Sequence, residues 1–412
     1  MKPFLRLLTT EQAYEQLALV EPLGTETVSS RACLGRVLAE PVTAREDVPH
    51  FFRSNMDGFA VRAQDTYAAS DTSSVALELI GEVAMGALAV EPIRPGCALR
   101  VSTGAMMPPG ADAVVLVEHT EEIGGRILIR SAVVPGASTI AIGEDLRCGD
   151  PVLEAGHRIR GSDVGVITGV GRSHVVVRKV PRVGVAATGD EIVEPEDELP
   201  PGRVRNVNQY LLASMARSLG ASVTDYGVVR DDEAALRSLL ERARAECDVL
   251  IVSGGSSMGS KDLVLGSVSG AEQAQVVFHG IAIAPGKPTM LARIGPLAIL
   301  GVPGNPSAAA VVFTLFGSTL IRVREGEPLA RILARRPRVR ARLTENLSST
   351  PGREDYVRVR LEQAGDDELL RARPLRGKSV TISTIARADA LLRIPRSSEG
   401  LSAGTEVEVL LF

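Results

Sequence analysis

The sequence contains no tryptophan, and aromatic residues make up only 3% of its 412 residues. Proteins that hold single-stranded nucleic acid stack its bases on aromatic side chains, so this composition disfavours such a surface. The net charge of −4 provides no general attraction for a phosphate backbone either. We therefore expect no nucleic-acid partner.

Cysteine and histidine are also scarce. Cys33, Cys97, Cys148 and Cys247 lie far apart and form no C-x-x-C pair, so neither a disulfide framework nor a zinc site is indicated. The five histidines show no metal-ligand spacing. The N-terminus lacks the apolar core and cleavage site of a signal peptide. These features predict a reducing, cytoplasmic location.

Residues 294–321 carry no charge, which raises the question of a membrane span. The segment Pro303-Gly304-Asn305-Pro306 interrupts this stretch in its middle, where a membrane helix needs continuous hydrogen bonding. A strand, a turn and a helix inside a buried core explain the stretch better. We expect no membrane partner.

The hydrophobic pattern changes its period along the chain, whose length suggests about two to four domains. A helix is expected first, because Thr9 and Gln12 form a capping box and apolar residues follow at helical spacing. From about 24 to 180 the pattern is strand-like and rich in glycine and proline. From about 181 to 328 strands alternate with amphipathic helices, and after 328 the pattern is β again.

Alternating strands and helices predict a parallel sheet covered by helices on both faces. One helix is expected over 206–221, with Leu211, Met215 and Leu219 on its buried face and Gly220 at its end. Another starts at Asp231 or Asp232. The predicted fold is thus an α/β plus β multidomain chain, with a three-layer α/β domain, β-rich N-terminal modules and a small C-terminal β-barrel.

The segment "DVLIVSGGSSMGSKD" (248–262) resembles a strand that leads into an anion-binding loop, because glycines let backbone N–H groups approach an oxyanion. It is not a P-loop: Gly254 and Gly259 have the spacing, but Ser260 precedes Lys261. It also matches the nucleophile elbow G-x-S-x-G around Ser257. A hydrolase histidine would have to be His279, which follows too closely for that fold.

Other loops of the α/β region carry polar groups that suit the same site. "ATGDE" supplies Asp190 and Glu191, "PGKP" supplies Lys287, and "GVPGNPSA" supplies Asn305 and Ser307. Backbone amides and a lysine suit a tetrahedral oxyanion, whereas carboxylates beside it call for a bridging cation. Hard oxygen ligands favour Mg²⁺ over zinc. Taken singly, each residue also has an ordinary role as a turn or cap residue.

The motifs "SNMDGFAV", "STGAMMPPGADAVV", "GEDLR", "ATGDEI", "SGGSSMGSKD", "PGKP" and "GVPGNPSA" occur in this order along the chain. In this set and order the chain resembles the MoeA/gephyrin E-domain family, the molybdopterin molybdenumtransferases. The resemblance implies insertion of molybdate into the dithiolene of adenylylated molybdopterin, with Mg²⁺-dependent release of AMP. It also implies an elongated homodimer whose cleft lies between the α/β domain of one copy and the "MDG" domain of the other.

The resemblance further implies a domain division and a set of site residues. The expected domains are an N-terminal helix (1–23) that packs on the α/β domain, a β-rich linking domain (24–44 with 146–180), an inserted β-rich domain (45–145), a molybdopterin-binding α/β domain (181–328) and a C-terminal barrel (329–412). The expected catalytic residues are Asp57, Thr103, Asp145, Glu191, Asp231 and Asp262, of which Glu191, Asp231 and Asp262 are candidate Mg²⁺ ligands. The expected substrate-binding residues are Ser253, Gly254, Gly255, Ser256, Gly286, Lys287, Pro303, Gly304, Asn305, Pro306, Ser307 and Arg353, with Arg358 as the alternative arginine.

The chain departs from the family pattern at Gly280 and Ala284, where many members carry lysine. This difference leaves open whether molybdate or tungstate is preferred. The alternatives are therefore a tungstate-preferring paralogue and a non-catalytic molybdopterin-binding scaffold. A sister enzyme that adenylylates molybdopterin is disfavoured by the two β regions, although a separate molybdopterin adenylyltransferase remains a candidate partner.

Overall fold

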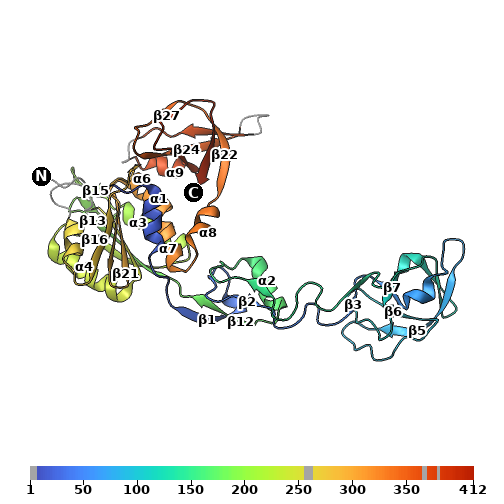
Figure 1. Ribbon diagram of the computed structural model, residues 1–412. Helices are drawn as coiled ribbons and strands as arrows, with labels where there is room; N and C mark the ends of the chain where they lie inside the picture. Colours follow the sequence, from blue (N-terminus) through green and yellow to red (C-terminus); the bar gives the residue numbers. More distant parts are fainter. Residues whose placement is uncertain (1–6, 255–262, 364–368, 378–380) are drawn as a thin grey trace.

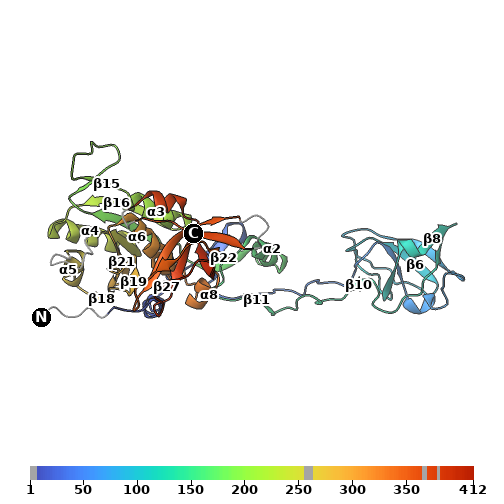
Figure 2. The same cartoon turned by 90° about the horizontal axis from the view of Figure 1, so that it is seen from above.

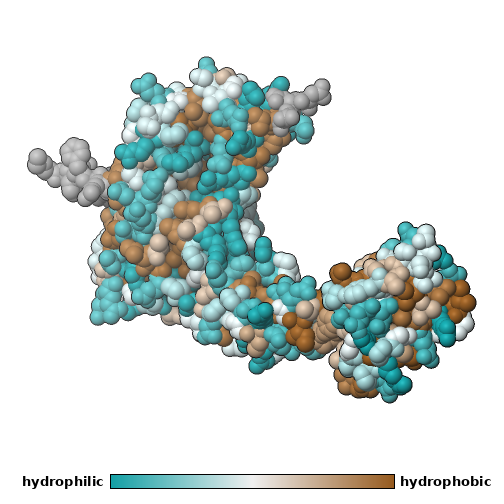
Figure 3. Space-filling view, turned by 45° about the vertical axis from the view of Figure 1, so that its right-hand side comes forward, coloured by the Kyte–Doolittle hydropathy of each residue, from teal (hydrophilic) through white to brown (hydrophobic). Residues whose placement is uncertain are grey.

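The computed structural model describes residues 7–254, 263–363, 369–377 and 381–412. The molecule is elongated (Figures 1 and 2): an α/β domain and a β-barrel form a body, and a narrow connection leads to a separate sheet. We call residues 24–44 with 146–180 the linking module and residues 45–145 the distal module. Figure 3 shows the distal module standing clear of the body.

The α/β domain is built on a single sheet whose strand order is β16-β13-β17-β21-β20-β18. The first four strands are parallel, and β20 runs antiparallel to both of its neighbours, so β18 points the same way as the parallel strands. In the order of the sheet the strands are β16 (Ser222–Val229), β13 (Arg182–Thr188), β17 (Val249–Ser253), β21 (Leu297–Val302), β20 (Met290–Ile294) and β18 (Ala274–His279).

Helices cover both faces of this sheet, as the alternating pattern predicts, and give the domain three layers. One face carries α1 (Thr10–Ala18), α3 (Asn208–Ser218) and the continuous run of α6 (Pro306–Val312), a π-helical turn (Phe313–Gly317) and α7 (Ser318–Arg324). The other face carries α4 (Glu233–Glu246) and α5 (Leu263–Ser269).

The ends of the predicted helices are largely confirmed. The capping box of Thr9 and Gln12 is present at the start of α1, and Asp232, not Asp231, caps α4. The predicted face of α3 is partly wrong. Met215 and Leu219 lie at the edge of the core, whereas the fully buried positions are Leu212, Ala213 and Ala216.

The uncharged stretch 294–321 folds as a strand, a turn and a helix, as predicted. The helical run Pro306–Arg324 is long and apolar enough to cross a membrane, but 78% of its most apolar window is buried inside the protein. It packs in the α/β core beside α1 and α3. Its hydrophobicity is therefore explained by burial within the protein.

The linking module is a compact unit with its own small core. Its antiparallel pairs are β1 (Thr25–Ser29) with β12 (His174–Arg178), and β2 (Val42–Thr43) with β11 (Pro151–Leu153); α2 (Gly161–Gly169) packs beside them. Beyond β2 and β11, two extended segments run to the distal module, where β3 (Arg53–Ser54) pairs with β10 (Thr139–Ile140).

The distal module contains a sheet with hydrophobic clusters on both faces. Its strand order is β7 (Ala113–Leu116), β4 (Gly58–Val61), β6 (Cys97–Val101), β5 (Val75–Val83), β9 (Arg126–Ile129) and β8 (Thr120–Ile123). The pair β5–β6 is parallel and the other pairs are antiparallel.

The C-terminal part is a closed barrel, as predicted, and α8 (Leu329–Ala334) leads into it. The barrel strands are β24 (Glu354–Glu362), β25 (Leu370–Pro374), β22 (Arg338–Leu343), β28 (Glu406–Leu411) and β26 (Ala390–Ile394), and β26 pairs back with β24. A short strand of the α/β domain, β19 (Ile283–Ala284), adds to β24 and ties the barrel to the body.

Candidate functional site

The strands of the α/β sheet end level with one another at one edge. Val229 of β16 lies opposite Thr188 of β13, and Ser253 of β17 lies opposite Val302 of β21. Because β18 runs in the same direction, the loop after it, residues 280–289, leaves from this edge too. The carboxyl edge of a parallel sheet is the usual place for a ligand. The predicted acid, glycine, lysine and asparagine loops therefore converge here.

A buried asparagine joins two of these loops. The side-chain amide of Asn208, at the start of α3, donates to Ser253 Oγ (2.6 Å) and to the carbonyl oxygen of Gly304 (2.7 Å). Asn208 and Ser253 are only 8% and 1% exposed. Sequence reasoning missed Asn208, although an asparagine at the start of a helix that follows this edge was the signal that was available.

The first glycine of the predicted anion loop is sterically required. Gly254 has φ +94°, and a Cβ on it would lie 2.4 Å from the carbonyl oxygen of Thr188. Its N–H donates to the carbonyl of Val302 (3.2 Å), and a Cβ on Gly304 would lie 3.6 Å from Gly254 Cα. The ends of β13, β17 and β21 are thus in direct contact around Gly254.

Carboxylates gather at the ends of β13 and β16. Asp190 and Glu191 follow β13, and Asp231 follows β16, where its N–H faces Asp190 Oδ1 at 3.4 Å. The pKa of Asp231 is raised, first by partial burial of its carboxyl group and then by repulsion from Asp190 and Glu191. Since Asp232 caps α4, Asp231 is left to face the other acids. A cation between these groups would relieve the repulsion.

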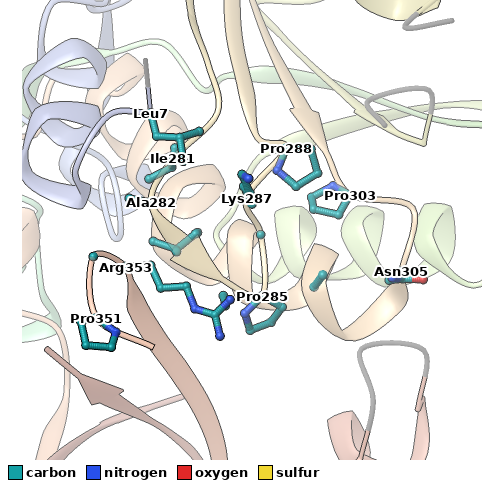
Figure 4. A pocket seen from close by; sticks show the side chains of 15 residues that line it. Leu7, Ile281, Ala282, Pro285, Lys287, Pro288, Pro303, Asn305, Pro351 and Arg353 are labelled. Carbon is teal, nitrogen blue, oxygen red and sulfur yellow. The ribbon is translucent and has the colours of Figure 1, made fainter. Parts of the chain in front are cut away.

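A pocket of about 460 Å³ lies beside the ends of β21 and β18. Lys287, Gly286, Pro303 and Asn305 line it from the α/β domain, and Arg353 lines it from the barrel (Figure 4). The pairing of β19 with β24 brings these walls together. Arg353 Nε contacts Asp355 Oδ1 at 2.8 Å, while its guanidinium group points into the pocket. Cationic groups on facing walls suit an oxyanion.

The alternative arginine, Arg358, is not among the residues that line this pocket. Its side chain is buried, 8% exposed, on the face of β24 opposite Val357 and Val359 of the barrel core, and Nε and Nη1 have no hydrogen-bond partner among the described residues. Burial lowers its pKa. Its Nη2 donates to the carbonyl of Gly377 (3.5 Å). A buried guanidinium group with unpaired N–H groups is the kind of group that binds an anion.

Two of the predicted catalytic residues, Asp57 and Thr103, form a second cluster in the distal module, which lies far from the α/β sheet within one copy of the chain (Figures 1 and 2). Asp57 Oδ1 accepts hydrogen bonds from Thr103 N (2.7 Å) and Thr103 Oγ1 (3.0 Å), and both residues are exposed. Asp145 is exposed where the chain returns toward the linking module. One copy therefore does not bring all the predicted catalytic residues together.

Comparison with known proteins decides the family. Residues 8–171 match the MoeA N-terminal region (domain I and II), residues 184–323 match a probable molybdopterin binding domain, and residues 340–412 match the MoeA C-terminal region (domain IV). The chain is 33% identical over 381 residues to a molybdopterin molybdenumtransferase of Staphylococcus epidermidis, covering 92% of this chain and 89% of that protein. The chain belongs to the MoeA family of molybdopterin molybdenumtransferases.

Further relatives agree with this assignment. A molybdopterin molybdenumtransferase of a Nostoc species is 32% identical over 396 residues, covering 94% of this chain and 88% of that protein. The crystal structure of a molybdopterin biosynthesis MoeA protein from Pyrococcus horikoshii has a TM-score of 0.82 and 34% identity, covering 98% of this chain and 99% of that one. The chain is thus an enzyme of the MoeA family with that family's fold.

The remaining MoeA site predictions fall into three groups. Gly255, Ser256 and Asp262 lie outside the described residues, as does Ser257 of the hydrolase hypothesis. Pro306 is the first residue of α6, and Ser307 is fully buried behind the pocket wall. Of the positions that depart from the family, Ala284 lines the pocket, whereas Gly280 is buried and is not a lining residue. Ala284 is therefore the departure that bears directly on the pocket.

The acids at the sheet edge fit a metal ion only in part. Among the described residues no group of three or more histidine, cysteine, aspartate or glutamate side chains is placed to hold a metal ion. Glu191 and Asp231 are oxygen donors of the kind that Mg²⁺ prefers, and repulsion from Glu191 adds to the effects of burial and of Asp190 that raise the pKa of Asp231. Further ligands would have to come from Asp262, from substrate oxygens or from water.

Proposed function

We propose that the protein inserts molybdate into the dithiolene of adenylylated molybdopterin and releases AMP in a Mg²⁺-dependent reaction. The observation that carries this proposal is the common sheet edge, which holds acids at β13 and β16 and a cationic pocket beside β21. Adjacent strands lie about 4.8 Å apart, so β13 and β21, two spacings apart, are separated by about 10 Å. A ligand that touches both must be extended and anionic, as an adenylylated pterin with its pyrophosphate is.

The residues at this edge divide into two roles. The N–H groups and side chains of the loop that begins at Ser253 and Gly254 hold a phosphate, and Asn208 keeps that loop against the loop of Gly304. Lys287 and Arg353 offset the charge of the oxyanion in the pocket. An oxygen of the oxyanion held there attacks the phosphorus nearer the pterin, the P–O bond to AMP breaks, and AMP leaves as its phosphate. The attacking oxygen stays on the pterin phosphate while its bond to the metal breaks and the two dithiolene sulfurs, which release their protons, bind the metal.

In this proposal Mg²⁺ binds at the carboxylates that follow β13 and β16. Bound by some of Glu191, Asp231 and Asp262, it would polarise the pyrophosphate and favour AMP as a leaving group. Its binding requires Asp231 in the carboxylate form. Because the pKa of Asp231 is raised, the affinity for Mg²⁺ falls as the pH drops through that raised pKa.

We further propose that the working form is a cytoplasmic homodimer in which the distal module of one copy meets the sheet edge of the other. Within one copy the distal module, which carries Asp57 and Thr103, is separated from the α/β domain, and this separation supports the arrangement (Figure 2). Closed two-fold dimers are the commonest protein assemblies and expose each surface twice, so both sites would be completed at once. A molybdopterin adenylyltransferase is the candidate source of the substrate.

The test is AMP release from adenylylated molybdopterin with Mg²⁺, with molybdate and tungstate titrated in parallel. We expect AMP release to depend on the oxyanion. The oxyanion with the lower half-saturation concentration, molybdate or tungstate, identifies the preferred metal. Lys287→Ala should raise that concentration more than it weakens nucleotide binding. Lys179→Ala, an exposed lysine of the linking module, is the matched control. Tight pterin binding without release under either oxyanion would instead support a scaffold.

A further inference from the structure

The linking module contacts the body around one turn, residues 325–328, between α7 and α8, and at Arg331 of α8, which pairs with Glu154 (3.0 Å). We call this turn and the linking-module residues that contact it the joint. On the body side the turn belongs to the α/β core through α7 and to the barrel through α8. On the other side, Arg158 of the linking module lies against Glu325 and Glu327. The joint therefore connects the α/β domain and the barrel to the linking module, which leads to the distal module.

Among the described residues, Arg158 makes the ion pairs between the linking module and this turn. Its Nη2 pairs with Glu325 Oε2, its Nε donates to Glu327 Oε2 (3.1 Å), and its Nη1 donates to the carbonyl of Gly35 (2.8 Å). The side chain of Glu327 is only 1% exposed and also faces Arg322 at 3.4 Å. Charge-assisted hydrogen bonds with buried partners are directional and resist competition from water.

Close packing surrounds these ion pairs. A Cβ on Gly156 would lie 2.8 Å from Pro328 Cδ, so the backbone of the linking module rests directly on the turn. A Cβ on Gly326 would lie 2.9 Å from the side chain of Arg178. Arg178 in turn donates to the carbonyl of Leu23 (3.0 Å). The contact at Gly156 has one preferred orientation, because only the rigid ring of Pro328 separates the two backbones there.

We propose that Arg158 is a positioning residue for the reaction: its bonds to Glu325 and Glu327 fix the direction in which the linking module carries Asp57 and Thr103 toward the second copy. The proposal rests on the proposed function, in which those residues complete the partner's site. It adds that the direction is set at the joint, far from the reacting atoms.

A small change of angle at the joint moves the distal module by several ångströms. Nine residues, 44–52, separate β2 from β3, and an extended chain of that length spans at most about 30 Å. A rotation of about 5° at its base then moves its far end by about 3 Å. Misplacement of a catalytic group by about 1 Å can cost about 100-fold in rate. A small loosening at Arg158 should therefore be visible in turnover.

The buried carboxylates explain why an arginine is used here. Burial raises the pKa of Glu325, and the opposing charge of Arg158 lowers it. Burial alone would lower the pKa of Arg158, but Glu325 and Glu327 more than offset this effect and raise it. Arg158 therefore favours the charged form of Glu325, although burial leaves the pKa of Glu325 above its ordinary value. Removal of Arg158 alone leaves buried negative charge, which destabilises the fold as well as the contact.

The experiment measures the direction of the distal module. Spin labels are placed on cysteines at the exposed positions Thr72 and Glu241, in a Cys148→Ser chain diluted with excess unlabelled chain. Arg158→Met keeps an apolar stem of similar length without the charge, and we expect its label-to-label distance distribution to broaden. Arg160→Met is the matched control, because Arg160 pairs with Asp163 inside the linking module.

Turnover is measured on the same variants. Arg158→Met should lower the maximal rate of AMP release about tenfold to 100-fold, with the oxyanion half-saturation within about twofold of the native value, because the pocket is untouched. Arg160→Met should behave as the native chain does. The double variant Arg158→Met with Glu325→Gln removes the unbalanced charge, so its unfolding temperature should recover while its distance distribution stays broad.

A native-width distribution in Arg158→Met, or equal broadening in Arg160→Met, would overturn the proposal. Recovery of the native distribution in the double variant would also overturn it, since charge burial alone would then be the cause. If the native chain released no AMP, the proposed function would fail, and the distance distributions would still decide whether Arg158 sets the direction of the distal module.

Discussion

Replacement of Gly254 by alanine tests how tightly the loops at the sheet edge are packed. An alanine at φ +94° is strained by about 1–2 kcal/mol, as any L-residue is in the left-handed region. Its Cβ would also lie 2.4 Å from the carbonyl oxygen of Thr188, so β13 or the loop must shift. Overpacking of this kind costs about 1–3 kcal/mol. The expected destabilisation is therefore about 2–5 kcal/mol.

Gly220 provides the matched control for this substitution. It has a similar φ of +88°, but a Cβ there would have no atom within 4 Å. Gly220→Ala should therefore show the strain alone, about 1–2 kcal/mol. The difference between the two variants isolates the contact with Thr188.

Hydrogen exchange is the suitable assay, because a chain of several modules does not unfold in one step. Amides of β13 and β17 should lose protection in Gly254→Ala and stay close to native in Gly220→Ala. AMP release should fall only in Gly254→Ala, since a shift of Thr188 moves Asp190 and Glu191. Equal loss of protection in both variants would refute the close packing described around Gly254.

Further predictions concern single residues of the site. Asp231→Asn should abolish Mg²⁺-dependent release yet raise the unfolding temperature near pH 7, because a carboxyl group whose pKa is raised in the folded protein destabilises the fold once the pH rises through that pKa. This gain in stability should vanish below the ordinary pKa of aspartate. A lower unfolding temperature at pH 7 would contradict the account. Arg358→Met should stabilise the barrel in thermal unfolding, because an apolar side chain replaces a buried cation that has no paired acid among the described residues. The same change should weaken oxyanion-dependent release. Destabilisation would contradict the burial cost assigned to Arg358. Asn208→Ala leaves Ser253 Oγ and the Gly304 carbonyl without their donor. The rate of hydrogen exchange at the ends of β17 and β21 should therefore rise by an amount that corresponds to about 2–4 kcal/mol. Unchanged hydrogen exchange would mean that Asn208 does not hold the loops together.

The parts of the fold that follow from local pattern were predictable. Buried strands such as Val249–Ser253 and caps such as Thr9 leave a direct signal in a few neighbouring residues. The buried face of α3 was misjudged because its position is set by Asn208, whose bonds to Ser253 and Gly304 fix the helix start. Side-chain hydrogen bonds to residues distant in sequence leave no periodic trace.

The prediction of the site was also limited by contacts between residues that are distant in sequence. The convergence of the glycine, acid and lysine loops follows from the parallel sheet, and the structure brings them to one edge. The arginine that lines the pocket together with Lys287 could not be decided from sequence, because the pairing of β19 with β24 places Arg353 at the pocket, whereas Arg358 is buried on the face of β24 opposite the barrel core. The joint at Arg158 was also missed, since ion pairs between distant segments have no local signature.

The claim that the site is shared between two copies can be tested by mixing two variants. Asp57→Asn and Lys287→Ala chains are unfolded and refolded together or co-expressed, and AMP release is measured at an oxyanion concentration low enough that neither variant releases AMP alone. In a mixed dimer one site carries both changes and the other carries neither, so random pairing should restore about a quarter of native activity. If the mixture stays as inactive as its parents, Asp57 and Lys287 act within one copy, and the shared site is wrong.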